Sequence, residues 1–235
     1  MTLNDLLDFQ EDLNERPNRP LPAKAISVPA AWTLCLALFA LSLALASTLS
    51  LQTLYVSIAL LLCIVLYDGL LKNGLAGAAT MAMCRYGNWM LGLSLIPLSV
   101  QSWILPLPIF FYITALTYLS KQETRAENPN AMFVVAFLLG LCCAAIVAIN
   151  LYFYNGNWIG LATVILFSAA IAQRLFLTFR DFTPENVQAT VVWMIIGIIP
   201  LDALMAIAAG HYMIAVVILT LLPICRFLSK RLAMT

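Results

Sequence analysis

The sequence predicts an all-α protein, a polytopic transmembrane helical bundle of about eight spans. Of its 235 residues, 63% are apolar and only 10% are charged, whereas soluble domains carry about 45–50% apolar and about 25% charged residues. So few charges do not cover a water-facing surface, which excludes a soluble globular enzyme. A disordered chain is excluded as well, because it needs low hydrophobicity and high charge. The net charge of +1 provides no basic face, so we expect no nucleic-acid partner.

Eight apolar stretches approach the length that a membrane helix needs, about 20 residues. They run near 31–48, 51–71, 75–98, 103–120, 131–152, 157–178, 188–207 and 211–228. They lack the roughly ten-residue alternation of barrel strands, which favours helices. The joints between them are short, so we expect consecutive helices to lie antiparallel. We predict a single membrane domain over 1–235, with a polar segment at 1–29 and the helical bundle at 30–235.

The positive charges indicate an orientation in the membrane. Eleven of the twelve lysine and arginine residues fall within 1–29, at the ends of the second, fourth and sixth stretches, or at 226–231. The twelfth, Arg85, lies inside a stretch. Because lysine and arginine concentrate in cytoplasmic loops, we predict a multi-pass protein of the cell (inner) membrane. Its N-terminal segment and its C-terminus are expected to face the cytoplasm.

The polar N-terminal segment carries regularly spaced acidic residues. Asp5, Asp8 and Asp12 follow the spacing i, i+3, i+7, which places three carboxylates on one stripe of a helix, where they repel each other. A bound cation reverses this effect, and Mg²⁺ prefers carboxylate oxygens together with substrate phosphates. Arg16 continues the stripe and Arg19 follows it, and arginine matches phosphate oxygens in a bidentate manner. The alternative is a solvated acidic terminus that binds nothing.

These residues also carry a family resemblance. The segment Asn4-Asp5-x-x-Asp8-x-x-x-Asp12, followed by Arg16-Pro17-x-Arg19-Pro20-Leu21, resembles the first Asp-rich motif of the UbiA superfamily of integral-membrane prenyltransferases. The resemblance extends over the whole chain. Three further segments are most similar to the Ebo-type UbiA-like branch, namely Tyr67-Asp68-x-x-Leu71-Lys72, Cys84-Arg85-x-x-Asn88 and Leu201-Asp202-Ala203.

The resemblance implies a mechanism and a site. Asp5, Asp8 and Asp12 would be the catalytic and metal-binding residues, and they would hold Mg²⁺ on the diphosphate of an isoprenyl diphosphate. The diphosphate would leave, and an unknown acceptor would attack the allylic carbocation. Asn4, Arg16, Arg19 and Lys72 are expected to contact the substrate. The bilayer would surround the isoprenoid tail.

Polar residues near or inside the spans are further candidates for substrate binding. Arg85 lies deep in its stretch with Asn88 at i+3, and an intramembrane arginine is a functional hypothesis by default. The alternatives for Arg85 are a structural ion pair or a side chain that snorkels to water. Asp68 and Lys72 are spaced i, i+4 and either contact substrate or form a plain surface salt bridge. We also expect Asp202 to contact His211 across a short turn.

The second acidic motif of the family is altered in this chain. The corresponding segment contains Tyr118 and Glu123 and has no aspartate. Glu123 and Glu127 are spaced i, i+4 and form a possible substitute pair. The alternative is an ordinary loop of mixed charge. We expect Tyr118 and Glu123 to belong to the substrate site.

The motif begins at residue 4, whereas the resemblance implies a helical hairpin around it. We therefore expect either a start that lies upstream or a chain that lacks the hairpin. Three functional hypotheses follow. The first is a prenyltransferase, and the second is a catalytically degenerate UbiA-like protein that binds a lipid or a diphosphate. The third is a transporter of another class, which would place charged residues through the depth of the bundle, whereas only Arg85 and Asp202 are placed in this way.

Overall fold

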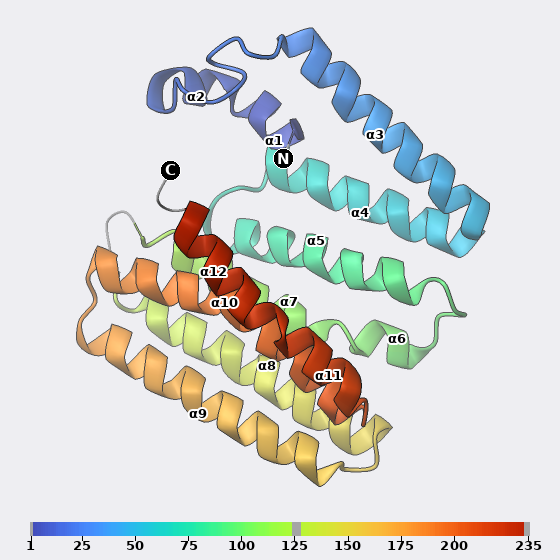
Figure 1. Cartoon of the computed structure of the whole chain (residues 1–235), viewed down its shortest axis with the longest axis vertical. Coiled ribbons are helices and arrows are strands. Elements are labelled where there is room, and N and C mark those ends of the chain that lie inside the picture. Colours follow the sequence, from blue (N-terminus) through green and yellow to red (C-terminus); the bar gives the residue numbers. More distant parts are fainter. Residues whose placement is uncertain (1, 124–127, 233–235) are drawn as a thin grey trace. The chain divides into compact units, whose positions relative to one another are not determined.

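The computed structural model describes residues 2–123 and 128–232 (Figure 1). Within these ranges every regular element is a helix, which confirms the predicted all-α class. The chain divides into two compact units, residues 1–99 and residues 100–235, and each is described here by itself. The predicted single membrane domain stays a prediction.

The first unit consists of a short helical entry and three long helices. The entry is α1 (Thr2–Leu7) and α2 (Phe9–Glu15), and the long helices are α3 (Val28–Leu49), α4 (Leu51–Gly69) and α5 (Gly74–Leu93). Helix α4 packs between α3 and α5, and α1 packs on both α3 and α4. Leu3 and Leu6 of α1 bury against Ala31 and Cys35 of α3. This apolar contact fixes the acidic segment to the membrane helices.

The second unit contains seven described helices. These are α6 (Val100–Ile104), α7 (Leu107–Ser120), α8 (Ala131–Phe153), α9 (Trp158–Arg180), α10 (Pro184–Ala208), α11 (Tyr212–Leu219) and α12 (Leu221–Leu232). Helix α8 packs on α7 and α9, and α10 packs on α7 and α9 as well. Close packing is visible where the buried Tyr112 donates its hydroxyl to the carbonyl of Met194 at 2.8 Å. At Gly197, a Cβ atom would lie 2.3 Å from that hydroxyl oxygen.

The number of spans differs from the prediction. In the described part of the chain, six helices are long and apolar enough to cross a membrane, including α6 and α7 taken together. The stretch predicted at 75–98 forms α5, whose Arg85 and Asn88 make it more polar than the others. The stretch predicted at 211–228 is divided at Thr220 into α11 and α12. Six of the eight predicted spans thus meet both length and composition, and the spans predicted at α5 and at 211–228 stay predictions.

The predicted joints are confirmed within each unit. Ser50 alone separates α3 from α4, and its hydroxyl accepts a hydrogen bond from the amide of Thr53. Gly156 lies between α8 and α9 with a φ of +68°, a conformation that glycine adopts without strain. The expected contact between Asp202 and His211 is wrong, because no hydrogen bond or ion pair joins them in the described part of unit 2. One carboxylate oxygen of Asp202 is buried there without a partner.

Candidate functional site

The acidic motif forms two short helices instead of one. Helix α1 ends at Leu7 and α2 begins at Phe9, with Asp8 between them at φ −85° and ψ 4°. Helical hydrogen bonds still run across the break, from the amide of Asp8 to Asn4 and from the amide of Asp12 to Asp8, both at 2.9 Å. The segment therefore keeps a nearly helical rise. The three carboxylates do not share a single partner, however.

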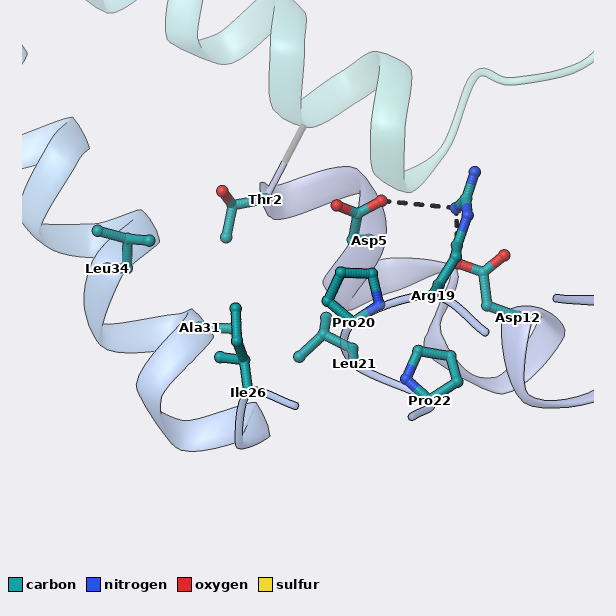
Figure 2. Close-up of a pocket in the computed structure, with 10 residues that line it drawn as sticks. All are labelled: Thr2, Asp5, Asp12, Arg19, Pro20, Leu21, Pro22, Ile26, Ala31 and Leu34. Carbon is teal, nitrogen blue, oxygen red and sulfur yellow. Dashed lines mark hydrogen bonds and ion pairs between the residues drawn. The ribbon is translucent and has the colours of Figure 1, made fainter. Parts of the chain in front are cut away.

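Arg19 joins two of the carboxylates (Figure 2). Its Nη1 donates to Oδ2 of Asp12 at 2.7 Å and to Oδ1 of Asp5 at 3.5 Å. The Asp12 side chain is 5% exposed, while those of Asp5 and Arg19 are 38% and 34% exposed. The hydrogen bond that Arg19 donates to Asp12, with the nearby negative charges, raises the pKa of the Arg19 guanidinium above its usual value. The arginine is therefore a permanent counterion in this site.

Asp8 has different partners. The Nζ of Lys72, in the turn that precedes α5, donates to Oδ1 of Asp8. The side-chain amide of Asn4 donates a hydrogen bond to Oδ2 of Asp8 at 3.0 Å. Asn4 and Lys72, which were expected to contact the substrate, both bond to Asp8, and their contact with substrate stays a prediction. Lys72 thus bonds to Asp8 of the motif, whereas the alternative of a plain surface salt bridge paired it with Asp68.

Beside this cluster is an open cavity of about 610 Å³, which runs from the motif along the inner faces of α4 and α5. Its polar lining joins residues far apart in the sequence, and the members that sequence reasoning had singled out are Asn4, Asp5, Arg19, Asp68, Arg85 and Asn88. Ionisable side chains from three separate segments thus face one space. This juxtaposition is what a site for a charged ligand requires.

Apolar cavities adjoin the polar one. A second cavity of about 620 Å³ lies between α3, α4 and α5, and leucine and alanine side chains form most of its wall. It shares Leu60 and Asn88 with the polar cavity. A third of about 130 Å³ lies where Pro20 and Leu21 meet α3, next to Arg19 (Figure 2). Sequence analysis missed Leu60, because a single leucine in an apolar helix has no distinguishing pattern.

Arg85 and Asn88 have no partner in their own unit. Within residues 2–99 no hydrogen bond or ion pair to either side chain is present, so the structural ion pair considered for Arg85 is absent there. Both side chains are exposed within the open cavity that they line.

Three other candidates remain, one in the first unit and two in the second. Arg16 ends α2, where its backbone amide bonds to Asp12, and its side chain is exposed. Tyr118 and Glu123 belong to the second unit and are partly buried. Burial raises the pKa of the Glu123 carboxyl above its ordinary value. Glu127 lies outside the described residues. The roles of all three candidates stay predictions.

Some of the motif carboxylates are suited to binding a hard cation such as Mg²⁺. Within the described residues, no three His, Cys, Asp or Glu side chains are grouped in a way that could hold a metal ion. Asp5 and Asp12, however, both reach one nitrogen of Arg19, so a single cation can contact both carboxylates. Mg²⁺ typically takes one or two carboxylates and completes its shell with water and substrate phosphates. Two carboxylates are therefore sufficient on the protein side.

Comparison with known proteins adds the family. Residues 1–180 match the UbiA prenyltransferase family. The chain belongs to this family. Together with the apolar helices described above, this membership makes the chain a multi-pass membrane protein. The resemblance inferred from the Asp-rich segment is thereby confirmed at the level of the superfamily, while the Ebo-type branch and the missing hairpin stay predictions.

Individual relatives agree with the family. Digeranylgeranylglyceryl phosphate synthase from Sulfurisphaera tokodaii is 26% identical over 153 residues, which are 59% of this chain and 52% of the relative. The synthase of the same name from Saccharolobus solfataricus is 25% identical over 154 residues, 59% of this chain and 51% of the relative. The chain thus spans about half the length of the curated relatives it matches.

A solved structure from work on digeranylgeranylglyceryl phosphate synthase in membranes has the same fold. Its TM-score is 0.70 with 18% sequence identity, and the match covers 89% of this chain and 80% of that chain. At this identity the likeness concerns the fold alone.

Proposed function

We propose that this UbiA-family protein transfers an isoprenyl group from an isoprenyl diphosphate to an acceptor at the cavity described above. The supporting observation is the adjacency of two unlike spaces. A polar cavity bordered by Asp5, Arg19 and Asp68 shares two wall residues with an apolar cavity of about 620 Å³. A diphosphate with an apolar tail needs both environments next to each other.

In this proposal Asp5 and Asp12 hold Mg²⁺, and Asp8 supports the segment through Lys72. When bound, Mg²⁺ would neutralise charge on the diphosphate and make it a better leaving group. Arg19 and Lys72 now neutralise the motif carboxylates. Once metal is present they are free to donate to phosphate oxygens, and cations aimed at developing negative charge are an effective form of catalysis.

The chemistry breaks the bond between the allylic C1 carbon and the diphosphate oxygen. The electron pair leaves with the diphosphate, and the acceptor then forms the new bond to C1 and loses a proton. Water must be kept from the allylic cation, because hydrolysis competes with transfer. The leucine-rich walls of the apolar cavity provide that exclusion.

A second candidate is ligand binding without turnover. It is favoured by the complete internal pairing of the motif, in which Arg19 and Lys72 satisfy Asp5, Asp8 and Asp12. A protein of this kind would bind an isoprenyl diphosphate and release it unchanged.

The two candidates are separated by measuring diphosphate release and binding with purified full chain in lipid nanodiscs. The substrate is geranylgeranyl diphosphate with a mixture of membrane lipids as acceptors, with and without Mg²⁺. For the wild type we expect Mg²⁺-dependent binding and release of diphosphate. Asp12→Asn should reduce the rate by about 10²-fold or more, since electrostatic groups at such sites contribute on that order. Binding without release would favour the second candidate.

Glu11→Gln is the matched control. Glu11 is the exposed neighbour of Asp12 on α2, and it lines none of the cavities described. Its substitution removes one negative charge from the same helix and should leave the rate unchanged. Equal loss in the two variants would attribute the effect to bulk charge, and metal-independent binding would remove the carboxylates from the site.

A further inference from the structure

We infer that Cys63 and Cys84 form a redox-responsive thiol pair, a modification site that a small peroxide oxidises to a reversible disulfide between α4 and α5. Both cysteines are free in the structure and both are half-buried. The two helices that carry them lie side by side in the first unit (Figure 1). Formation of the disulfide does not depend on the proposed function, and only its effect on turnover does.

The first step in the argument is the register of the two helices, which two contacts fix. Near the start of α4, the hydroxyl of Thr53 donates to the carbonyl of Ser94 at 3.2 Å. Farther along α4, Cδ1 of Leu60 lies 3.0 Å from the place of a Cβ atom on Gly87. Leu60 follows Thr53 by seven positions, and Gly87 precedes Ser94 by seven. Residues seven apart share a helix face, so the two helices run antiparallel in one continuous register.

The second step extends this register to the cysteines. Cys63 lies three positions after Leu60, and Cys84 lies three positions before Gly87. Because residues three apart are neighbours on a helix surface, both thiols belong to the α4–α5 interface, one turn beyond the contact of Leu60 with Gly87. The sulfur of Cys63 accordingly acts electrostatically on that of Cys84, and more strongly than the charged side chains nearby do.

The third step is that facing positions on packed helices lie at the distance that a disulfide needs. The axes of packed helices are about 8–10 Å apart, and Cα atoms lie about 2.3 Å from the axis. Facing Cα atoms are therefore roughly 3.5–5.5 Å apart, and a modest offset brings them into the range of about 4.4–6.8 Å that disulfides span. We therefore expect the two sulfur atoms to meet by rotation of their side chains.

The fourth step is access for an oxidant. Cys84 lines the open polar cavity beside Tyr67 and Asp68, so a water-soluble peroxide reaches its sulfur through that cavity. Hydrogen peroxide oxidises this thiol to a sulfenic acid and releases water. The thiol of Cys63 then attacks the oxidised sulfur, and the hydroxyl leaves with the thiol proton as a second water. Two thiols and one peroxide thus give one disulfide and two waters, and a dithiol reductant reverses the step by exchange.

The disulfide would join the two helices that form the walls of the polar cavity. Tyr67 lies one turn after Cys63, and Arg85 directly follows Cys84. Tyr67 and Arg85 both line that cavity. A fixed separation of α4 and α5 prevents these walls from adjusting to a substrate, and a displacement of about 1 Å at a reaction site costs up to about 10²-fold in rate. Oxidation should therefore lower turnover, and reduction should restore it.

The test is treatment of the purified full chain in lipid nanodiscs with hydrogen peroxide. All cysteines outside the pair are first replaced, by Cys35→Ser, Cys142→Ser, Cys143→Ser and Cys225→Ser. After free thiols are blocked with N-ethylmaleimide, mass spectrometry should find a chain that is lighter by two hydrogens and carries no maleimide, and a peptide that links Cys63 to Cys84. Dithiothreitol should restore two reactive thiols. Absence of the linked peptide would overturn the inference.

Leu62→Cys combined with Cys63→Ser is the matched control. It moves the thiol one position along α4, which turns it by about 100° around the helix axis. Leu62 is 58% exposed, so the thiol is displaced from the interface without disturbing a buried side chain. This variant should lose the linked peptide under the same treatment. Equal linkage in the control and in the native pair would show that the register does not bring the two cysteines together, and would overturn the inference.

The thermal midpoint reports whether the link fits the native structure. A disulfide that matches native geometry stabilises a protein by restricting its unfolded chain. The oxidised pair should therefore unfold at a higher temperature than the reduced pair, and the difference should be absent in Cys84→Ser. A lower midpoint after oxidation would mean that the link forms only by distorting the helices, and the pair would then not be a native modification site.

Release of diphosphate from geranylgeranyl diphosphate reports the effect on the cavity. Oxidation of the pair should lower the rate of release by about tenfold or more, and dithiothreitol should restore it. Undiminished release by the linked chain would overturn the effect on the cavity. If the reduced chain releases no diphosphate, the proposed function fails, while the linked peptide and the thermal midpoint still report on the pair.

Discussion

At the scale of single residues, Arg19 is the counterion of two carboxylates of the acidic motif. It contacts both Asp5 and Asp12, and the side chain of Asp12 is 5% exposed. An arginine in this position competes with any metal for the same oxygens. The positive charge of Arg19 also offsets the mutual repulsion that the spacing of the three carboxylates predicts.

We therefore predict that Arg19→Gln strengthens binding of a bare divalent cation and weakens the fold. Mn²⁺ binding, measured by electron paramagnetic resonance without substrate, should become several-fold tighter because the competing guanidinium is gone. The nearly buried Asp12 would lose its partner, which costs about 1–3 kcal/mol of stability. Asn18→Gln, an exposed neighbour in the same turn, is the control. Unchanged Mn²⁺ affinity would show that Arg19 does not occupy a metal site.

Glu123 gives a second prediction, which concerns pH. Burial raises the pKa of its carboxyl, so the folded state binds a proton more readily than the unfolded state. The contribution of Glu123 to folding stability is fully present below the pKa of the unfolded state, about 4.3. It is lost as the pH rises through the pKa of the folded state. Glu123→Gln should therefore unfold at a higher temperature than the wild type at pH 8 and lose that advantage near pH 4.

The activity of the same variant distinguishes the two interpretations of this residue. If Glu123 substitutes for the second acidic motif, Glu123→Gln should be more stable at pH 8 and less active. An ordinary loop residue would give the stability gain with full activity. A variant that is less stable at pH 8 would contradict the burial argument itself.

At the scale of helices, Gly77 connects the packing of α5 to the site. A Cβ atom there would lie 2.5 Å from the carbonyl carbon and oxygen of Lys72, so the turn that presents Lys72 to Asp8 fits only against a glycine. Gly77→Ala should displace this turn, lower stability by about 1–3 kcal/mol, as overpacking does, and raise the KM for the isoprenyl diphosphate.

Gly140→Ala, inside α8, is the matched control. Nothing lies within 4 Å of a Cβ atom at Gly140, and alanine favours a helix by about 0.5–1 kcal/mol over glycine. The thermal midpoint of this variant should be equal to or above that of the wild type, with an unchanged KM. A similar loss in both variants would mean that the spacing at Lys72 is not what Gly77 provides.

The helices also show what the sequence could predict. Apolar length located the joints at Ser50 and Gly156, because a polar or glycine residue between two long apolar runs leaves no other place to turn. The same measure is less decisive at α5, since Arg85 and Asn88 make this helix more polar than the six candidate spans. The Asp8 break and the pairing of Asp8 with Lys72 depend on contacts between residues 64 positions apart. Helical spacing describes only local neighbours, so it could not predict them.

At the scale of the whole molecule, the family and the function depend on different kinds of signal. The Asp-rich spacing identified the superfamily, because a motif of several charged residues is improbable in an otherwise apolar chain. The shape of the candidate site is not encoded by such a motif. It depends on how Arg85 and Asn88 on α5 share one cavity with Asn4 and Asp5 on α1, which required the structure.

Membrane orientation is the remaining whole-molecule prediction. Eleven of the twelve basic residues lie on one predicted side, and a bias of this size sets topology because basic segments resist translocation. In a chain whose six native cysteines are replaced by serine, single cysteines are introduced by Gln10→Cys on α2, Gln122→Cys after α7 and Leu95→Cys after α5. An impermeant maleimide added to intact cells should label the Leu95→Cys variant, and the other two only after the membrane is opened.

The three positions make the orientation test independent of the proposed chemistry. Gln10 belongs to the motif segment, so its protection would place the proposed diphosphate site on the cytoplasmic side. Leu95 is 65% exposed, which gives the reagent access to it. Labelling of the Gln10→Cys and Gln122→Cys variants from outside, with protection of the Leu95→Cys variant, would invert the topology. The acidic motif would then have to meet its substrate outside the cell, which would contradict the cytoplasmic site that the charge distribution predicts.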